Sequence, residues 1–164
     1  MEGFNLWTCA CTGGTYGPLH EGHKKVFRYA FSLAKNLAIR LTTDEYLSEI
    51  SKKNLKELIP PYSKRFETLC EYLNQLYRGR FEILPLDTRE DCMNCMYKDI
   101  TMAMIAGEDS LAKAYRINLR RRESGLFEVD IFGVPAELSE SGKRISSTDI
   151  RKGEINRKGR IIIP

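Results

Sequence analysis

The stretch GGTYGPLHEGH, residues 13–23, decides the fold, because it marks where a buried strand stops and a helix starts. The six residues 6–11 (LWTCAC) form a short apolar run, which predicts a buried strand. From Glu21 onward, apolar residues fall at helical spacing. Both histidines of the chain, His20 and His23, therefore lie where this helix begins.

The rest of the chain alternates between the two patterns. Further strands are expected at 37–41, 81–86, 102–106 and 129–134, and the main helices at 21–35, 64–77 and 112–122. Two short helices are also expected, one capped by Asp44 and one that starts at Ser146. For the helix at 64–77, the expected cap is Ser63 and the expected inward residues are Phe66, Leu69, Tyr72, Leu73 and Leu76. The polar, basic segment 51–58 predicts a loop or a loose helix.

This alternation predicts an α/β fold: a Rossmann-like parallel sheet with helices on both faces, in one domain over residues 1–164. Ligands of such sheets bind outside the carboxyl ends of the strands. Residues 13–23 directly follow the first strand, so we expect them at that edge.

Composition narrows the class of partner. The net charge of +4 is compatible with an anionic small ligand and is too small to indicate nucleic-acid binding. No apolar run approaches the ~20 residues of a membrane span, and the first residues do not resemble a signal peptide. We expect a cytoplasmic protein whose partners are neither membranes nor nucleic acids.

The cysteines have several possible roles. The five are Cys9, Cys11, Cys70, Cys92 and Cys95. An odd count without a signal peptide argues against a disulfide framework. Cys92 and Cys95 form one CxxC pair, and a structural zinc site would need a second pair. A redox pair stays open, and reduced, partly buried thiols are the favoured interpretation.

The first motif has the residues of a phosphate cradle. Gly13 and Gly14 permit a tight turn and close approach of the backbone to a ligand. His20 and His23 lie on neighbouring positions of a first helical turn, where backbone N–H groups and the helix dipole attract anions. Gly22 leaves room between the two rings. Polar capping of the helix, or half of a metal site, are the alternatives that spacing alone leaves open.

A second motif follows far downstream. Residues 145–151 read ISSTDIR, with hydroxyl groups at the start of a helix and a bidentate donor, Arg151, one turn later. Taken alone it could be an ordinary helix cap with a solvated arginine. Together with residues 14–23, it resembles the paired signatures G-T-F-D-x-x-H-x-G-H and I-S-S-T-x-x-R of the nucleotidylyltransferase superfamily.

Three further segments resemble one group in that superfamily, the archaeal and eukaryotic phosphopantetheine adenylyltransferases. They are TTDE at 42–45, PYSKR at 61–65 and INLRRRESGL at 117–126. The resemblance covers residues 6 to 159, nearly the whole chain. It implies a transferase that uses ATP, with Mg²⁺ as cofactor, and 4′-phosphopantetheine, and that releases dephospho-CoA and pyrophosphate.

The resemblance also implies the site residues. The catalytic residues would be His20, His23 and Thr15. The ATP-binding residues would be Gly14, Thr15, Tyr16, His20, Gly22, His23, Ser146, Ser147, Thr148 and Arg151. The acceptor-binding residues would be Lys52, Lys53, Arg65, Asn118 and Arg121. No protein side chain is expected to bind the metal.

Two positions depart from the resemblance. Gly17 stands where the family usually has Asp, and Gly107 stands where this group more often has Ser. Two other functions therefore stay open. One is an adenylyl- or cytidylyltransferase of the same fold that acts on nicotinamide mononucleotide, FMN or glycerol phosphate. The other is a non-catalytic regulator that binds a nucleotide. The sequence does not indicate an oligomeric state.

Overall fold

The computed structural model describes residues 7–50, 55–88 and 102–162. The strands are β1 (Trp7–Gly14), β2 (Ala34–Thr42), β3 (Phe81–Leu86), β4 (Met102–Gly107) and β5 (Asp130–Val134). The α-helices are α1 (Glu21–Leu33), α2 (Asp44–Ile50), α3 (Tyr62–Tyr77), α5 (Leu111–Glu123) and α6 (Ser147–Arg151). Short 3₁₀ helices lie at Lys56–Leu58 and Glu108–Ser110.

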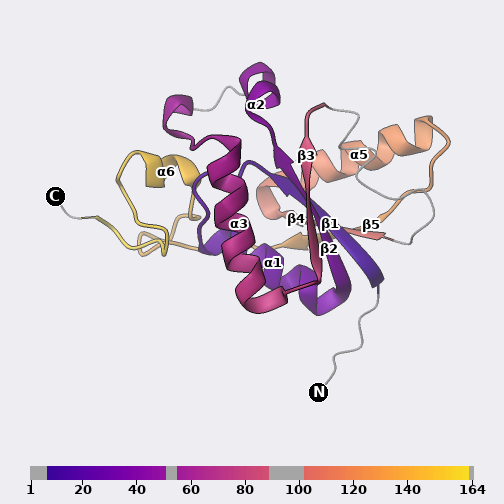
Figure 1. Cartoon of the computed structure of the whole chain (residues 1–164), viewed down its shortest axis with the longest axis horizontal. Helices are drawn as coiled ribbons and strands as arrows, with labels where there is room; N and C mark the ends of the chain where they lie inside the picture. Colours follow the sequence, from indigo (N-terminus) through magenta and orange to yellow (C-terminus); the bar gives the residue numbers. More distant parts are fainter. Residues whose placement is uncertain (1–6, 51–54, 89–101, 163–164) are drawn as a thin grey trace.

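The five strands form one parallel sheet in the order β3-β2-β1-β4-β5 (Figure 1). The chain builds outward from β1 through β2 to β3, and then returns to the other side of β1 for β4 and β5. Such a reversal opens a crevice at the carboxyl ends of the two strands where it occurs. The predicted Rossmann-like parallel sheet is confirmed.

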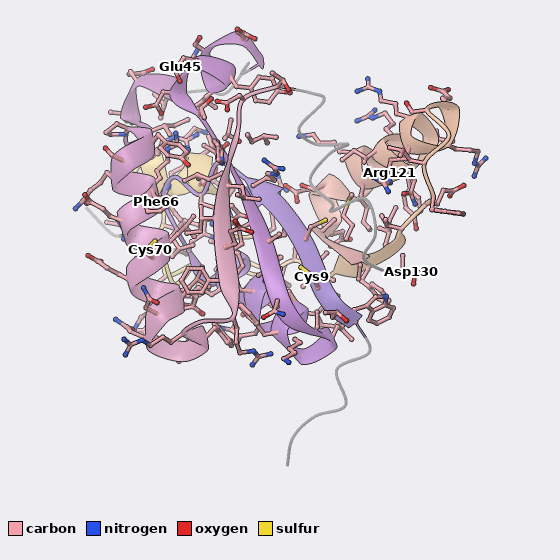
Figure 2. The ribbon with its side chains drawn as sticks, turned by 45° about the vertical axis from the view of Figure 1, so that its right-hand side comes forward. Cys9, Glu45, Phe66, Cys70, Arg121 and Asp130 are labelled. Carbon is pink, nitrogen blue, oxygen red and sulfur yellow. The ribbon has the colours of Figure 1, made fainter. Side chains whose placement is uncertain are left out.

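Helices cover both faces of this sheet, because side chains along each strand alternate between the faces. Ala10, Ile39 and Ile105 pack toward α1 and α3, in the larger of two apolar clusters. Cys11 and Met104 pack toward α5 in the smaller cluster. Figure 2 shows α3 and α5 on opposite sides of the sheet.

Strand β1 is longer at its end than the sequence predicts. Gly13 and Gly14 belong to it, because they pair with Arg40 and Leu41 of β2. The tight turn therefore follows the two glycines. Helix α1 starts at Glu21, as predicted, but ends at Leu33, since β2 begins at the next residue.

The buried face of α3 differs from the prediction. Leu69 and Leu73 are buried as expected, but Phe66 and Leu76 are 37% and 58% exposed. The buried stripe consists instead of Arg65, Leu69 and Leu73, and Arg65 is 1% exposed. The predicted inward positions of Phe66 and Leu76 are therefore wrong, because the buried face follows the four-residue spacing that begins at Arg65.

The expected caps at Ser63 and Asp44 are also wrong. Helix α3 begins at Tyr62, before the predicted cap Ser63, and the Tyr62 N–H donates to the Asp44 carboxylate at 2.9 Å. Asp44 does not cap α2 either, because the Thr43 hydroxyl accepts from the Tyr46 N–H at 3.3 Å. Asp44 thus caps a helix that starts eighteen residues later.

Among the described cysteines, Cys70 is a free thiol and Cys11 is buried. Cys92 and Cys95 lie outside the described residues, so the role of the CxxC pair stays open. No helix within the described ranges is long and apolar enough to cross a membrane.

Candidate active site

A cavity of about 980 Å³ opens at the carboxyl ends of the strands. The last residue of each of the five strands lines it: Gly14, Thr42, Leu86, Gly107 and Val134. All ten residues predicted to contact ATP line it as well: Gly14, Thr15, Tyr16, His20, Gly22, His23, Ser146, Ser147, Thr148 and Arg151. The fold thus brings the two sequence motifs to one cavity.

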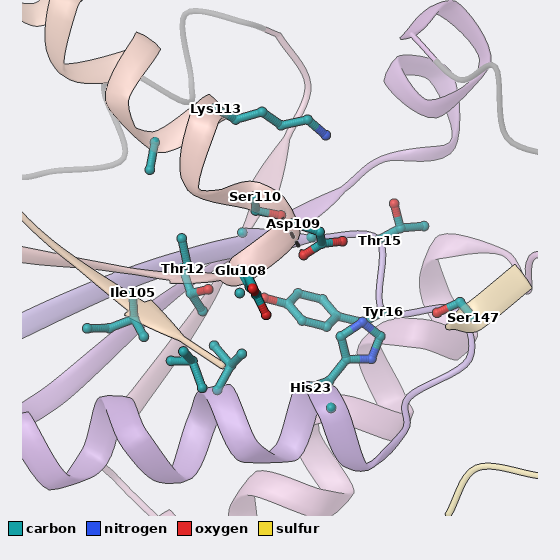
Figure 3. Close-up of a pocket in the computed structure, with 18 of the residues that line it drawn as sticks. Thr12, Thr15, Tyr16, His23, Ile105, Glu108, Asp109, Ser110, Lys113 and Ser147 are labelled. Atoms are coloured by element: carbon teal, nitrogen blue, oxygen red, sulfur yellow. Dashed lines mark hydrogen bonds between the residues drawn. The ribbon is translucent and has the colours of Figure 1, made fainter. Parts of the chain in front are cut away.

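Three aromatic rings form one wall of this cavity. The rings of His20 and His23 stack with centroids 3.8 Å apart, and Tyr16 meets His23 edge-on at 5.0 Å. Figure 3 shows the ring of His23 beside that of Tyr16. His20 is the last residue before α1 and His23 lies in its first turn, so the helix start fixes the spacing of the pair.

Two glycines make room for these rings. A Cβ atom on Gly22 would lie 3.0 Å from Cε1 of His20, and one on Gly14 would lie 3.1 Å from Cζ of Tyr16. Contacts this short require the neighbour to move. The space at Gly22 is therefore filled by the His20 ring itself.

The environment of His20 keeps it neutral. Burial lowers its pKa to about 4, although the charges of Asp109 and Glu21 partly oppose this, and Arg144 adds to it. Its Nδ1 atom is buried and has no hydrogen-bond partner among the described residues. At neutral pH a neutral imidazole carries one N–H donor, which can be directed at a phosphate oxygen.

Burial also raises the pKa of Tyr16, so its hydroxyl keeps its proton. Tyr16 has a positive φ of 50°, which is an uncommon backbone conformation for a residue other than glycine. The ring then packs against His23 and Phe27.

The second motif is joined to the first by hydrogen bonds. The Arg151 guanidinium donates to the Gly17 carbonyl at 2.8 Å and to the Thr148 hydroxyl at 3.2 Å. The Ser146 hydroxyl caps α6, because it accepts from the N–H groups of Thr148 and Asp149 at 3.1 and 3.2 Å. Two of the N–H groups that the sequence offers to a phosphate are thus already bonded within α6.

Arg65 was predicted to contact the acceptor, but it lies away from the cavity. It does not line the cavity, and its guanidinium donates to the carbonyls of Pro60, Thr15 and Thr42 at 2.8, 3.0 and 2.7 Å. It also pairs with the Asp44 carboxylate at 2.6 Å. Arg65 fastens the turn after β1 to the end of β2 and the start of α2.

The other predicted acceptor contacts are likewise placed elsewhere. Asn118 exchanges two hydrogen bonds with the backbone of Val129, at 2.8 and 3.0 Å, and Arg121 donates to the Phe127 carbonyl at 2.9 Å. Both are buried and neither lines the cavity, so they hold the connection between α5 and β5. Lys52 and Lys53 lie outside the described residues.

Cavity residues that the sequence analysis missed are cations. Lys113, Arg116 and Arg120 of α5 line the cavity, as do Arg40 and Arg144. The sequence did contain a signal for the three α5 residues, because they recur at the helical intervals of three and four positions. A basic helix is more often a solvated surface, and only the sheet places this face over the cavity.

The described residues do not offer a carboxylate cage for a metal ion. Among them, no group of three or more His, Cys, Asp or Glu side chains could hold one. Of the acidic residues at the cavity, Asp109 pairs with Arg144 at 2.6 Å and Glu137 pairs with Lys25 at 3.1 Å.

Comparison with known proteins agrees with this geometry. Residues 11–153 match the family model described as cytidylyltransferase-like. A bifunctional phosphopantetheine adenylyltransferase/NTP phosphatase of Thermoplasma volcanium is 33% identical over 152 residues, which are 93% of this chain but 44% of that protein. A phosphopantetheine adenylyltransferase of Thermococcus kodakarensis is 34% identical, over 90% of this chain and 87% of that protein.

Solved structures agree on the fold. A protein of unknown function from Archaeoglobus fulgidus has a TM-score of 0.62 at 26% identity, covering 76% of this chain and 87% of its own. A bifunctional NMN adenylyltransferase/ADP ribose pyrophosphatase from Francisella tularensis has a TM-score of 0.66 at 16% identity. The match covers 90% of this chain and 42% of that protein. The chain spans less than half the length of its bifunctional relatives. From the match over residues 11–153, the chain belongs to the cytidylyltransferase-like family.

Proposed function

We propose that this protein transfers the adenylyl group of ATP to 4′-phosphopantetheine, giving dephospho-CoA and pyrophosphate. One observation carries the proposal: two motifs far apart in the sequence line one cavity and are joined by the hydrogen bond from Arg151 to Gly17. The choice of acceptor is supported by archaeal relatives at 30–34% identity that bear the name phosphopantetheine adenylyltransferase.

The proposed reaction is a direct displacement at phosphorus. An oxygen of the acceptor phosphate attacks the α-phosphorus of ATP, the bond from that phosphorus to the bridging oxygen breaks, and pyrophosphate leaves with the electron pair. Negative charge gathers on the equatorial oxygens of the α-phosphate, so catalysis needs positioned donors rather than a protein nucleophile. We assign this role to His20 and His23, and the orientation of the attacking phosphate to Thr15.

The remaining cradle residues would hold ATP. Gly14 and Gly22 allow the close approach, and Ser147, Thr148 and Arg151 face the cavity from α6. Mg²⁺ bound with ATP would supply positive charge to the leaving pyrophosphate. Lys52 and Lys53 remain predicted contacts of the acceptor phosphate. We propose the cytoplasm as the location of this reaction.

Pyrophosphate release tests this proposal. Purified protein would be given ATP and Mg²⁺ with 4′-phosphopantetheine, nicotinamide mononucleotide, FMN or glycerol phosphate in parallel. We expect release that depends on 4′-phosphopantetheine. Release with only another acceptor would refute the acceptor, and ATP binding without release for any acceptor would favour the regulator.

A further inference from the structure

The chain folds back on itself after α6 in a compact turn. Residues 156–160, which we call the C-terminal turn, close through two backbone bonds: the Asn156 N–H donates to the Arg160 carbonyl, and the Gly159 N–H donates to the Asn156 carbonyl, both at 2.9 Å. Inside the turn, Oδ1 of Asn156 accepts from the N–H groups of Lys158 and Arg160 at 2.9 and 3.1 Å. The Asn156 side chain therefore holds the shape of this turn, which belongs to the yellow loop beyond α6 in Figure 1.

The turn caps α1 from outside. The first N–H groups of a helix have no partner within it and are usually capped by the side chain of the preceding residue. At α1 that residue is His20, whose side chain makes no capping hydrogen bond and whose ring stacks on that of His23. The Arg157 carbonyl accepts instead from the N–H of Glu21, the first residue of α1, at 3.1 Å. The turn thus provides a partner that the His20 side chain does not.

The same turn packs against the second motif. A Cβ atom on Gly159 would lie 2.7 Å from Cδ1 of Ile145 and 3.0 Å from Cα of Ser139, and the φ of Gly159 is 78°. Only glycine fits this contact and this backbone conformation without strain. The Gly159 carbonyl also accepts from the Glu140 N–H at 2.9 Å. Since Ile145 directly precedes Ser146, the cap of α6, the turn contacts both motifs close to the start of their helices.

The C-terminal turn contributes no side chain to the cavity. Within the part of the chain that the structure describes, none of residues 156–160 lines it. Any effect of the turn on the reaction must then pass through the placement of His20 and His23 relative to α6. Transfer at phosphorus depends on such placement, because a shift of about 1 Å can lower a rate about 100-fold.

We propose that the C-terminal turn is a positioning element of the active site: it caps α1 through the Arg157 carbonyl and thereby sets the His20 and His23 rings relative to the second motif. Asn156 and Gly159 are then positioning residues, since they act through the turn and touch no reacting atom. This inference rests on the proposed function only for the catalytic role of the two rings. Their placement can be measured whichever acceptor is used.

A pair of variants at Glu21 tests the capping bond. Proline is favoured at the first position of a helix and lacks the N–H, so Glu21→Pro removes the donor to Arg157 and should leave α1 intact. Glu21→Ala is the matched control, because it loses the same side chain and keeps the N–H. We expect kcat for pyrophosphate release to be about tenfold lower in Glu21→Pro than in Glu21→Ala, with a KM for ATP that differs by less than about threefold.

The imidazole NMR signals report on the two rings without turnover. The chain has two histidines, so untagged protein gives imidazole signals from His20 and His23 alone. Rings stacked 3.8 Å apart shift each other's proton signals. We expect both sets of signals to move further from their wild-type positions in Glu21→Pro than in Glu21→Ala. Signals and kcat that are equal in the two variants would overturn the proposal.

Asn156 gives a second test, which does not alter α1. Asn156→Ala loses the acceptor of two N–H groups, whereas Asn156→Asp keeps an acceptor oxygen. We expect Asn156→Ala to move the imidazole signals and to lower kcat, and Asn156→Asp to keep both near their wild-type values. A lower thermal stability of Asn156→Ala with unchanged imidazole signals would reduce the turn to a structural role and overturn the proposal. Failure of pyrophosphate release with every acceptor would refute the proposed function, and the imidazole signals would still decide the role of the turn.

Discussion

The imidazole rings of His20 and His23 stack face to face, with centroids 3.8 Å apart and planes inclined by 23°. Two positively charged rings at this distance would repel each other. Stacking is therefore compatible with at least one neutral ring, and burial, by lowering the pKa of His20, provides it. In the proposed reaction, the pair would offer N–H donors to a phosphate without placing two buried charges side by side.

His23 gives the first prediction. His23→Ala should lower kcat by about 10² to 10³, the scale of removing one donor to the transition state, with a smaller change in the KM for ATP. Pyrophosphate release measures it. Arg28→Ala, on the same helix but outside the cavity, is the control and should keep the wild-type kcat. Unchanged turnover in His23→Ala would remove this residue from the mechanism.

The pKa of His20 predicts a pH dependence of stability. The unfolded imidazole takes up a proton below pH 6.5, whereas the folded one stays neutral down to about pH 4. Stability is therefore lost as the pH falls through this window, by on the order of 1–3 kcal/mol from this group. Urea unfolding at pH 7 and pH 4.5 should show a smaller drop for His20→Gln than for the wild type. Equal drops would contradict the assignment.

A substitution at Gly22 should affect turnover much more than stability. Gly22→Ala gains up to about 1 kcal/mol of helix propensity but places its Cβ 3.0 Å from the His20 ring. We expect the unfolding free energy to change by less than about 1 kcal/mol while kcat falls about tenfold or more, because the ring is displaced. In a His20→Ala background the same change should cost no further activity, since the clash is gone. An additive loss would show that Gly22 acts without His20.

Arg65 is predicted to act through position rather than contact. Arg65→Lys keeps the charge but cannot reach the Pro60, Thr15 and Thr42 carbonyls and Asp44 together, so unfolding should become easier by about 2–4 kcal/mol. Because Thr15 lies at the cavity, kcat should fall more than the KM for the acceptor rises. Lys64, the exposed neighbour of Arg65, offers a control, since Lys64→Ala should change neither the free energy of unfolding nor kcat. A rise in the acceptor KM alone would restore Arg65 as a phosphate contact.

Gly17 should not tolerate the aspartate usual in the family. A Cβ there would lie 3.0 Å from Cδ of Arg65 and from Cγ2 of Ile59. Gly17→Ala and Gly17→Asp should both destabilise the protein by about 1–3 kcal/mol, because both introduce that atom. Thermal unfolding together with pyrophosphate release measures the effect. Faster turnover of Gly17→Asp at wild-type stability would show that the chain lacks a useful carboxylate.

The sequence predicted those parts of the molecule that local patterns determine. Strand β3 has its predicted bounds, and the cradle of residues 14–23 lies at the strand ends because a motif of adjacent residues folds as a unit. The parallel direction of the strands followed from the alternation of strands and helices along the chain. These features need no knowledge of distant neighbours.

The sequence did not predict contacts in which a side chain meets a partner far along the chain. Arg65, a predicted acceptor contact, is buried by Asp44 and by backbone carbonyls from two other segments. Asn118 and Arg121, also predicted acceptor contacts, bond to the connection beyond α5. Spacing on a helix indicates a face, and only the tertiary fold decides what that face meets.

The strand order has a consequence for how this family can diversify. Because β1 lies in the middle of the sheet, the segments at 13–23 and 145–151 build one half of the cavity, and α5 builds the other. Under the proposed function, substitutions on the α5 face can then alter the choice of acceptor without disturbing the residues proposed to bind ATP. Exchange of this one helix face is accordingly a compact route to new specificity, in evolution or by protein engineering.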